Sequence, residues 1–460
     1  MTIIKAYAYP HPPLAVPAVG RGEEEKIAIT LAAFEETAAE IARLAPETII
    51  FITPHNTLYA DYFIISPGEK AKGSLSRFGA PDVKFKVSYD KELAEEIGRL
   101  ARGNGIPAGP RGEKEASLDH GVMVPMWYID RFYQDYEVIR ISLSGREPAE
   151  HYRLGQSIAS AAEKTGRRTV LVASGDLSHK LPGSTYGFAP EGRDFDRIIT
   201  DAFSSGDFMP LFSISEDLRE RAGECGYNSF MILAGCFDRR KVESKLYSYE
   251  GPFGIGYAVA GFSPGEPDHS CNYLDRHRSL ILEKARESQA LEDPYRSLAR
   301  QSLEHMVNFG NILALPEDLP EELTKDRAGV FVSLHKGGRL RGCIGTIAPT
   351  KDNIALEIID NAVSAGIYDN RFDQVNAKEL PYLTYKVDIL SPPEPISGPE
   401  ELDVKRYGVI VSSGNKRGLL LPNLEGIDTV KEQIAIARKK AGISADAPVM
   451  LERFEVIRHE

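Results

Sequence analysis

The first part of the chain alternates short apolar runs with amphipathic stretches. Three apolar runs have the length and the β-branched content of buried strands. They are residues 48–53, 137–143 and 169–173. Between residues 27 and 44, apolar side chains instead recur every three to four positions and the pattern stops before Pro46, which predicts a helix. Residues 91–101 and 151–164 show the same helical pattern. This alternation predicts an α/β domain with a largely parallel sheet and helices on both of its faces.

The pattern changes after about residue 265. A polar segment with two prolines, residues 264–269, interrupts it, and a helical stretch follows at 274–291. Beyond it we predict a mixture of helices and strands. The helices are 294–313, 353–365 and 429–441, and the strands are 330–334, 385–390 and 408–412. We therefore expect a first domain at 1–265, a linker with a helix at 266–291, and an α+β domain at 292–460.

Composition narrows the class of protein. With 460 residues the chain is too long for one ordinary core. Its net charge of −12 makes nucleic acid and an anionic membrane surface unexpected partners. No apolar run reaches the roughly 20 residues that span a bilayer, and the four cysteines lack the spacing of disulfide or zinc-finger frameworks. The sequence thus predicts a cytoplasmic protein with reduced thiols. It is compatible with a homo-oligomer and does not determine the oligomeric state.

Three histidine segments are the main candidates for chemistry. His11 in Tyr-Pro-His-Pro-Pro and His55 in Thr-Pro-His-Asn each follow a predicted strand and lie beside prolines, which restrict the backbone. The segment Ser-Gly-Asp-Leu-Ser-His, ending at His179, follows another predicted strand. Ligand sites in open α/β sheets gather beyond the carboxyl ends of strands, so we expect these segments to share one crevice. The alternative is a set of loop histidines with structural hydrogen bonds only.

Two further residues complete a candidate metal site. His120 lies in Leu-Asp-His-Gly, and Glu224 lies in a glycine-flanked turn ahead of a predicted helix. Two imidazoles and one carboxylate on one face of a metal are typical of non-haem Fe(II) oxygenases. The same ligands suit a catalytic zinc ion with water in the fourth position. The ligand types alone therefore do not choose the metal.

Five motifs in this order resemble a known family. They are Pro-His-Pro-Pro, Thr-Pro-His, Asp-His-Gly, Ser-Gly-Asp-Leu-Ser-His and the late glutamate. The first 265 residues thereby resemble the class III extradiol ring-cleavage dioxygenases, the LigB-like family, and the related Memo proteins. The resemblance implies that His11, His55 and Glu224 bind Fe(II), with Zn or Cu as alternatives. It also implies that His179 is the catalytic acid–base and that His120 lies near a catechol-type aromatic substrate.

Asp176 and Cys225 bring the chain closer to the Memo proteins. There, an aspartate and a cysteine accompany the histidines and no ring-cleaving activity is implied. Cys225 is either a thiolate ligand or a small buried side chain. Asp176 either orients His179 in catalysis or caps a turn.

The second domain has its own characteristic stretch. Residues 340–346 read Leu-Arg-Gly-Cys-Ile-Gly-Thr, and with Asp-Asn-Arg-Phe at 369–372 they closely resemble the AMMECR1 domain. The resemblance covers about residues 292–460 and implies an α+β fold in two parts. Arg341 and Cys343 are a candidate second site, because a guanidinium group favours phosphate or carboxylate. The alternative is a tight glycine turn with a buried cysteine and solvated arginines.

The fusion of both domains resembles the AmmeMemoRadiSam system proteins, whose name implies a radical-SAM protein as partner. The leading hypothesis is a non-haem iron oxidoreductase of the extradiol dioxygenase type that acts on a catechol-type aromatic. The second hypothesis is a metal- or ligand-binding adaptor without ring-cleaving activity. The third is a zinc-dependent hydrolase that uses the same ligands.

Overall fold

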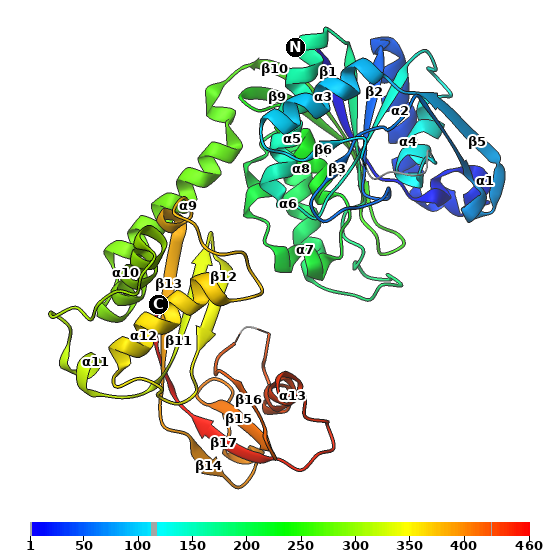
Figure 1. Cartoon of the computed structure of the whole chain (residues 1–460). Helices are drawn as coiled ribbons and strands as arrows, with labels where there is room; N and C mark the ends of the chain where they lie inside the picture. Colours follow the sequence, from blue (N-terminus) through cyan, green and yellow to red (C-terminus); the bar gives the residue numbers. More distant parts are fainter. Residues whose placement is uncertain (1, 112–116, 425) are drawn as a thin grey trace. The chain divides into compact units, whose positions relative to one another are not determined.

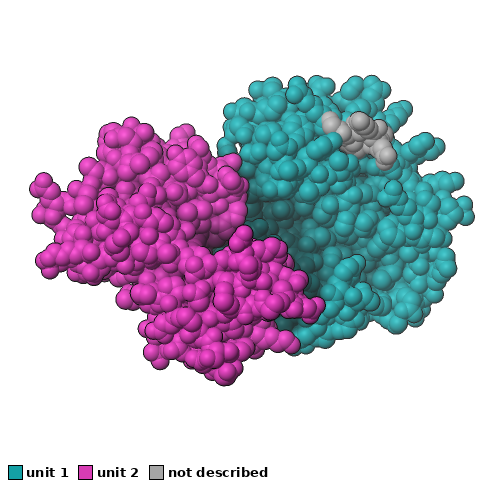
Figure 2. Space-filling view, turned by 60° about the horizontal axis from the view of Figure 1, so that its bottom comes forward, with its two compact units in different colours: residues 1–277 teal, residues 278–460 magenta. Residues whose placement is uncertain are grey.

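The computed structural model describes residues 2–111, 117–424 and 426–460. Figure 1 shows the order of the helices and strands along the chain. The chain divides into two compact units, Met1–His277 and Arg278–Glu460, which Figure 2 colours separately. The division falls inside the segment 266–291 that the sequence predicts as a linker. No helix in the described ranges has the length and apolar character needed to cross a bilayer.

A six-stranded sheet forms the centre of the first unit (Figure 1). Its strands are β1 (Ile3–Tyr9), β2 (Thr48–Thr53), β7 (Glu137–Ser142), β8 (Thr169–Ser174), β9 (Arg240–Glu250) and β10 (Tyr257–Pro267). Their order is β7-β2-β8-β1-β10-β9, and the first four are parallel. β10 and β9 add an antiparallel edge. The predicted mostly parallel sheet is confirmed.

Helices cover both faces of this sheet, which explains why its strands read as continuous apolar runs. Tyr7 and Phe51 lie in the core on one face, and Ala6 and Ile52 lie in the core on the other. The helices on the first face are α2 (Ala28–Leu44) and α4 (His120–Ile129). Those on the second face are α3 (Lys91–Gly103), α5 (Pro148–Thr165), α6 (Glu191–Ser205) and α8 (Tyr227–Cys236).

Shorter elements complete the first unit. They are the helices α1 (Pro17–Gly20) and α7 (Glu216–Ala222), the paired strands β4 (Lys70–Leu75) and β5 (Ala80–Ser88), and the pair β3 (Phe63–Ile64) and β6 (Ala108–Gly109). The helix α9 (Tyr273–Ala290) begins in the first unit, where Tyr273 belongs to the core, and continues into the second.

Helices α5 and α8 approach each other so closely that glycine is required in both. A Cβ atom on Gly155 of α5 would lie 2.0 Å from the backbone oxygen of Ile232. A Cβ atom on Gly235 of α8 would lie 1.9 Å from the backbone oxygen of Tyr152. The two helices thus pack backbone against backbone, and α8 is held firmly beside the sheet.

The second unit contains two four-stranded antiparallel sheets and belongs to the predicted α+β class. The first sheet, β12-β11-β13-β18, packs against α10 and α12, and the second, β14-β17-β15-β16, packs against α13. The strands are β11 (Gly329–Lys336), β12 (Arg339–Gly345), β13 (Leu383–Leu390), β14 (Glu394–Ile396), β15 (Gly408–Ser413), β16 (Lys416–Leu420), β17 (Met450–Phe454) and β18 (Val456–His459). The helices are α10 (Pro294–Phe309), α11 (Glu321–Lys325), α12 (Ile354–Val363) and α13 (Val430–Lys440).

Candidate metal centre

Three neighbouring strands deliver the central residues of the site. β2, β8 and β1 are adjacent and parallel, so their carboxyl ends meet at one edge of the sheet. His11 follows β1, His55 follows β2, and Asp176 and His179 follow β8. The structure therefore brings these strand ends together, as expected for an open α/β sheet.

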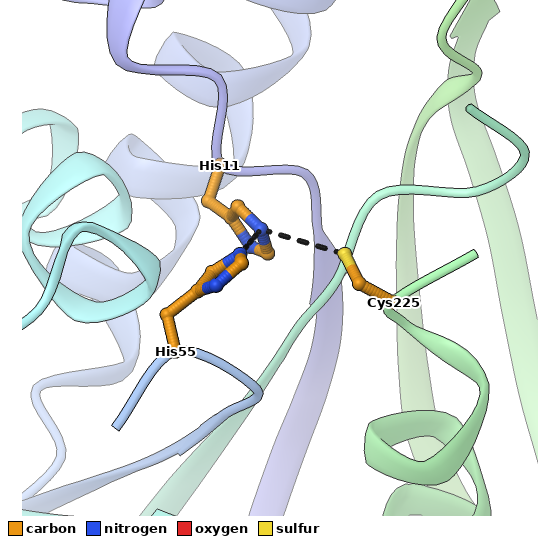
Figure 3. Close-up of side chains that lie close together, drawn as sticks. All are labelled: His11, His55 and Cys225. Atoms are coloured by element: carbon orange, nitrogen blue, oxygen red, sulfur yellow. Dashed lines mark hydrogen bonds between the residues drawn. The ribbon is translucent and has the colours of Figure 1, made fainter. Parts of the chain in front are cut away.

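His11, His55 and Cys225 converge on one point (Figure 3). The Nε2 atoms of His11 and His55 are 2.8 Å apart, and Cys225 Sγ lies 3.6 Å from His11 Nε2. All three donor atoms lie within 4.8 Å of one another. Two ring nitrogens and a sulfur that face each other at this spacing fit a transition metal ion, for which imidazole and thiolate are ordinary ligands.

Asp176 and His179 form a second donor group that shares Cys225. Donor atoms of Asp176, His179 and Cys225 also lie within 4.8 Å of one another. Asp176 connects both groups, because its Oδ1 accepts the backbone N–H of His11 at 2.9 Å and its own N–H donates to Cys225 Sγ at 3.3 Å. Five side chains thus surround one small polar centre.

A close backbone contact places Cys225 beside Asp176. A Cβ atom on Gly175 would lie 2.1 Å from Cα of Gly226, so the loop after β8 and the turn before α8 touch without an intervening side chain. The N–H of Gly226 donates to the backbone oxygen of Asp176 at 3.1 Å. The position of Cys225 therefore depends on two glycines, one in each loop.

Outer residues orient the two histidines. His11 Nδ1 and Ser174 Oγ are 2.8 Å apart, and a proton on Nδ1 leaves the lone pair of Nε2 facing the centre. Thr53 Oγ1 accepts the backbone N–H of His55 at 3.2 Å and donates to Asp119 Oδ1 at 2.6 Å. The sequence pattern does not single out Ser174 or Thr53, although each is the last residue of a strand that leads into the site.

Aromatic rings flank the centre. His120, the first residue of α4, stacks on His55 with ring centroids 4.0 Å apart, and Phe78 lies 5.3 Å from His120. Tyr186, which is 65% exposed, lies 5.5 Å from the ring of His179. His120 therefore lies near the candidate ligands and contributes a ring face to their surroundings.

Burial sets the protonation of the site in the absence of an ion. It lowers the pKa of His11 well below its usual value and that of His120 to about 3, so both imidazoles are neutral near pH 7. Burial and the nearby Asp176 raise the pKa of the Cys225 thiol well above its usual value. A metal ion that binds Cys225 as thiolate must therefore displace a proton.

Glu224 departs from the predicted ligand set. It is not a member of either donor group, although its neighbour Cys225 belongs to both. Its Oε2 instead accepts the backbone N–H of Tyr227 at 2.7 Å, at the start of α8, and burial raises its pKa to about 7. The side chains that come together are therefore His11, His55 and Cys225, whereas the carboxylate of the predicted ligand Glu224 accepts a backbone N–H of the helix that it precedes.

The two residues of the predicted second site, Arg341 and Cys343, bind different partners. Arg341 binds both carboxylate oxygens of Glu379, at 3.2 and 2.9 Å, whereas Cys343 Sγ accepts the hydroxyl of Ser333 at 3.1 Å. The backbone N–H of Cys343 donates to Asp369. The Arg341 guanidinium group is thus held by a carboxylate, and the Cys343 thiol by a hydroxyl group.

Replacement of Ser174 by alanine is expected to weaken metal binding about 10- to 100-fold, because His11 loses the partner that fixes its tautomer. Competition titrations with a metal-sensitive chelator measure the change. Ser157→Ala is a matched control, because Ser157 is an equally buried serine whose hydroxyl donates to Arg153 O within α5. Equal affinities for both variants would contradict the role of Ser174.

Comparisons with known proteins identify the families of the two domains. Residues 5–260 match the family model described as the catalytic LigB subunit of aromatic ring-opening dioxygenase, and residues 296–459 match the AMMECR1 model. A protein of Clostridium acetobutylicum is 42% identical over the full length of both chains. A protein of Thermotoga maritima is 53% identical over 171 residues, which is 37% of this chain and 98% of the relative.

A solved structure from Pyrococcus horikoshii is 32% identical and covers 36% of this chain and 88% of its own, with a TM-score of 0.34. The two family models together account for the N-terminal sheet with its histidine edge and for the C-terminal antiparallel sheets. The chain therefore belongs to the LigB family of the extradiol dioxygenase superfamily, here with an AMMECR1 domain in the same polypeptide.

Proposed function

We propose that the first unit is a metal-dependent oxidoreductase that opens a catechol-type aromatic ring with dioxygen. The observation that carries this proposal is the convergence of His11 Nε2, His55 Nε2 and Cys225 Sγ at the carboxyl edge of a LigB-type sheet. Fe(II) is the proposed ion, and when bound it supplies the place where dioxygen and the aromatic substrate exchange electrons.

His179 is the proposed proton acceptor. Its Nε2 atom is buried and has no hydrogen-bond partner among the described residues, so its lone pair is available to a substrate hydroxyl. Burial lowers the pKa of His179, and the charge of Asp176 opposes this effect. The imidazole is therefore neutral near pH 7 and ready to accept a proton, while Asp176 stabilises the protonated form that results.

The surrounding rings favour a planar substrate. His120 and Phe78 lie on the side of His55, and Tyr186 lies on the side of His179. Aromatic groups prefer offset or edge contacts with other rings, which orient a flat substrate as well as bury it. This supports an aromatic compound over an extended aliphatic one.

A second candidate function follows from the sulfur ligand. A thiolate in place of a carboxylate makes the donor set softer than that of the two-histidine, one-carboxylate oxygenases and suits Cu(I) or Zn as well. The unit would then be a metal-binding adaptor without ring-cleaving activity, with a radical-SAM protein as the proposed partner. The AMMECR1 domain in the same chain would supply the interaction module.

Metal analysis followed by dioxygen uptake separates these functions. The full chain is purified without oxygen, its metal content is measured, and uptake is recorded with a panel of catechols after Fe(II) loading. We expect one tightly bound ion and uptake that falls about 100-fold or more in His179→Gln with the iron content unchanged. His269→Gln is the control, because His269 is exposed and lies outside the site.

Each other outcome favours a different function. A tightly bound ion without uptake for any catechol contradicts the oxygenase and supports the adaptor. Stoichiometric zinc with hydrolysis of an ester or amide panel supports the third hypothesis, a zinc-dependent hydrolase on the same ligands.

A further inference from the structure

A cavity of about 570 Å³ lies in the first unit, beside the loop that follows His179. Its volume is within the usual range for small-molecule sites. The residues that line it include Leu181, Pro182, Arg193, Arg197, Thr200 and Tyr249. We propose that this cavity binds a small organic anion, with its carboxylate or phosphate group between Arg193 and Arg197 and its apolar part over Leu181 and Pro182.

The positive charges of Arg193 and Arg197 are only partly balanced by neighbouring carboxylates. Arg193 and Arg197 are four residues apart on α6, so their like charges lie on one face of the helix and repel each other. Arg193 forms no ion pair with any residue that the structure describes. Within the described ranges, Arg197 has one ion-pair partner, Asp194, at 3.5 Å, and both of these side chains are about two-thirds exposed. An anion between the two guanidinium groups would relieve the repulsion and could be bound by parallel N–H donors.

The buried carboxylate on the same helix, Asp196, does not compete for these arginines. Asp196 points inward, where its Oδ1 accepts the backbone N–H of Ser178 and its Oδ2 accepts the hydroxyl of Tyr249, both at 2.8 Å. Both oxygens thus have hydrogen-bond partners, and the residue is 1% exposed. The positive charge of the two lining arginines remains available to a ligand.

Leu181, Pro182 and the ring of Tyr249 give the cavity apolar surface that is fixed in place. Leu181 donates its backbone N–H to Gly254 O at 3.0 Å, and Pro182 follows with a restricted backbone. The ring of Tyr249, which is 41% exposed, is held in place by its hydrogen bond to Asp196. These surfaces favour a ligand that combines one anionic group with a hydrocarbon or aromatic part.

Ligand-observed NMR titrations of the full chain test the site with four probes: phenyl phosphate, benzoate, inorganic phosphate and benzyl alcohol. We expect phenyl phosphate or benzoate to bind at least about tenfold more tightly than inorganic phosphate and than benzyl alcohol, which lack one half of the proposed ligand. The phosphate and carboxylate probes also show which anionic group the arginines prefer. Absence of binding by both aromatic anions, or equal binding of all four probes, would overturn the proposal.

Variants locate the bound probe. The double variant Arg193→Gln/Arg197→Gln is expected to weaken binding of the better aromatic anion about tenfold or more, because it removes both charged donors. Arg99→Gln/Lys164→Gln is the charge-matched control, since these exposed residues pair with Glu96 elsewhere on the surface. His55→Ala, which changes the metal centre, is expected to leave binding unchanged. Loss of binding in His55→Ala but not in the arginine variant would place the anion at the metal centre and overturn the proposal.

Discussion

Replacement of Cys225 by serine is expected to weaken metal binding by the first unit by on the order of 100-fold or more. The reason is that Cys225 Sγ belongs to both donor groups and lies 3.6 Å from His11 Nε2, whereas a serine hydroxyl is shorter and a poor ligand for soft ions. Dissociation constants from chelator competition, together with metal content after dialysis, measure the change.

Glu224→Gln is the matched control for that loss. The two residues are neighbours in one turn, but the Glu224 carboxylate accepts the N–H of Tyr227, a role that a glutamine oxygen retains. We expect Glu224→Gln to bind the metal within about threefold of the unaltered protein, since no ligand is removed. A large loss in Glu224→Gln with little change in Cys225→Ser would restore the ligand set predicted from the sequence.

Replacement of Gly155 by alanine is expected to lower the free energy of unfolding of the first unit by about 1–3 kcal/mol. The added Cβ would lie 2.0 Å from the backbone oxygen of Ile232, so α5 and α8 would have to separate. Denaturant titrations followed by a signal specific to the first unit measure the change. Because α8 begins two residues after Cys225, we expect a weaker metal affinity to accompany the loss of stability.

Gly103→Ala is the control for this prediction. Gly103 is the last residue of α3, and a Cβ atom there has no neighbour within 4 Å. Since alanine is the better helix former, we expect the free energy of unfolding to be unchanged or raised by up to about 1 kcal/mol. The same substitution is thus expected to lower the free energy of unfolding in α5 and to leave it unchanged or raise it in α3. A loss as large in Gly103→Ala as in Gly155→Ala would contradict the packing argument.

The buried strands of the fold could be predicted because a strand that is covered on both faces consists of apolar residues without interruption. β2 and β8 are covered on both faces and appear in the sequence as continuous apolar runs. The edge strand β9 was not predicted. Its alternate residues, such as Lys241, Glu243 and Lys245, are exposed, so its sequence contains no continuous apolar run. The polar hairpin of β4 and β5 escaped for a similar reason.

The candidate site was partly predictable. The positions of His11, His55 and His179 follow from the rule that parallel strands end at a common edge, which depends on the backbone alone. Whether Glu224 or Cys225 faces the two histidines depends on which side chain binds the first turn of α8. The two residues are adjacent in a glycine-flanked turn, and the sequence pattern does not show which of them points toward the histidines. That Arg341 and Cys343 bind different partners was unpredictable for a related reason. The register of β11 and β12 shifts next to Arg341, between the pairs Leu334–Gly342 and His335–Leu340.

X-ray absorption spectroscopy of the metal-loaded full chain tests the central claim most directly. With zinc or iron bound, we predict a first shell that contains nitrogen neighbours at about 2.0–2.1 Å and one sulfur neighbour at about 2.3 Å. The sulfur contribution should disappear in Cys225→Ser and persist in Glu224→Gln. A first shell of nitrogen and oxygen only in the unaltered protein would contradict a metal centre built from His11, His55 and Cys225.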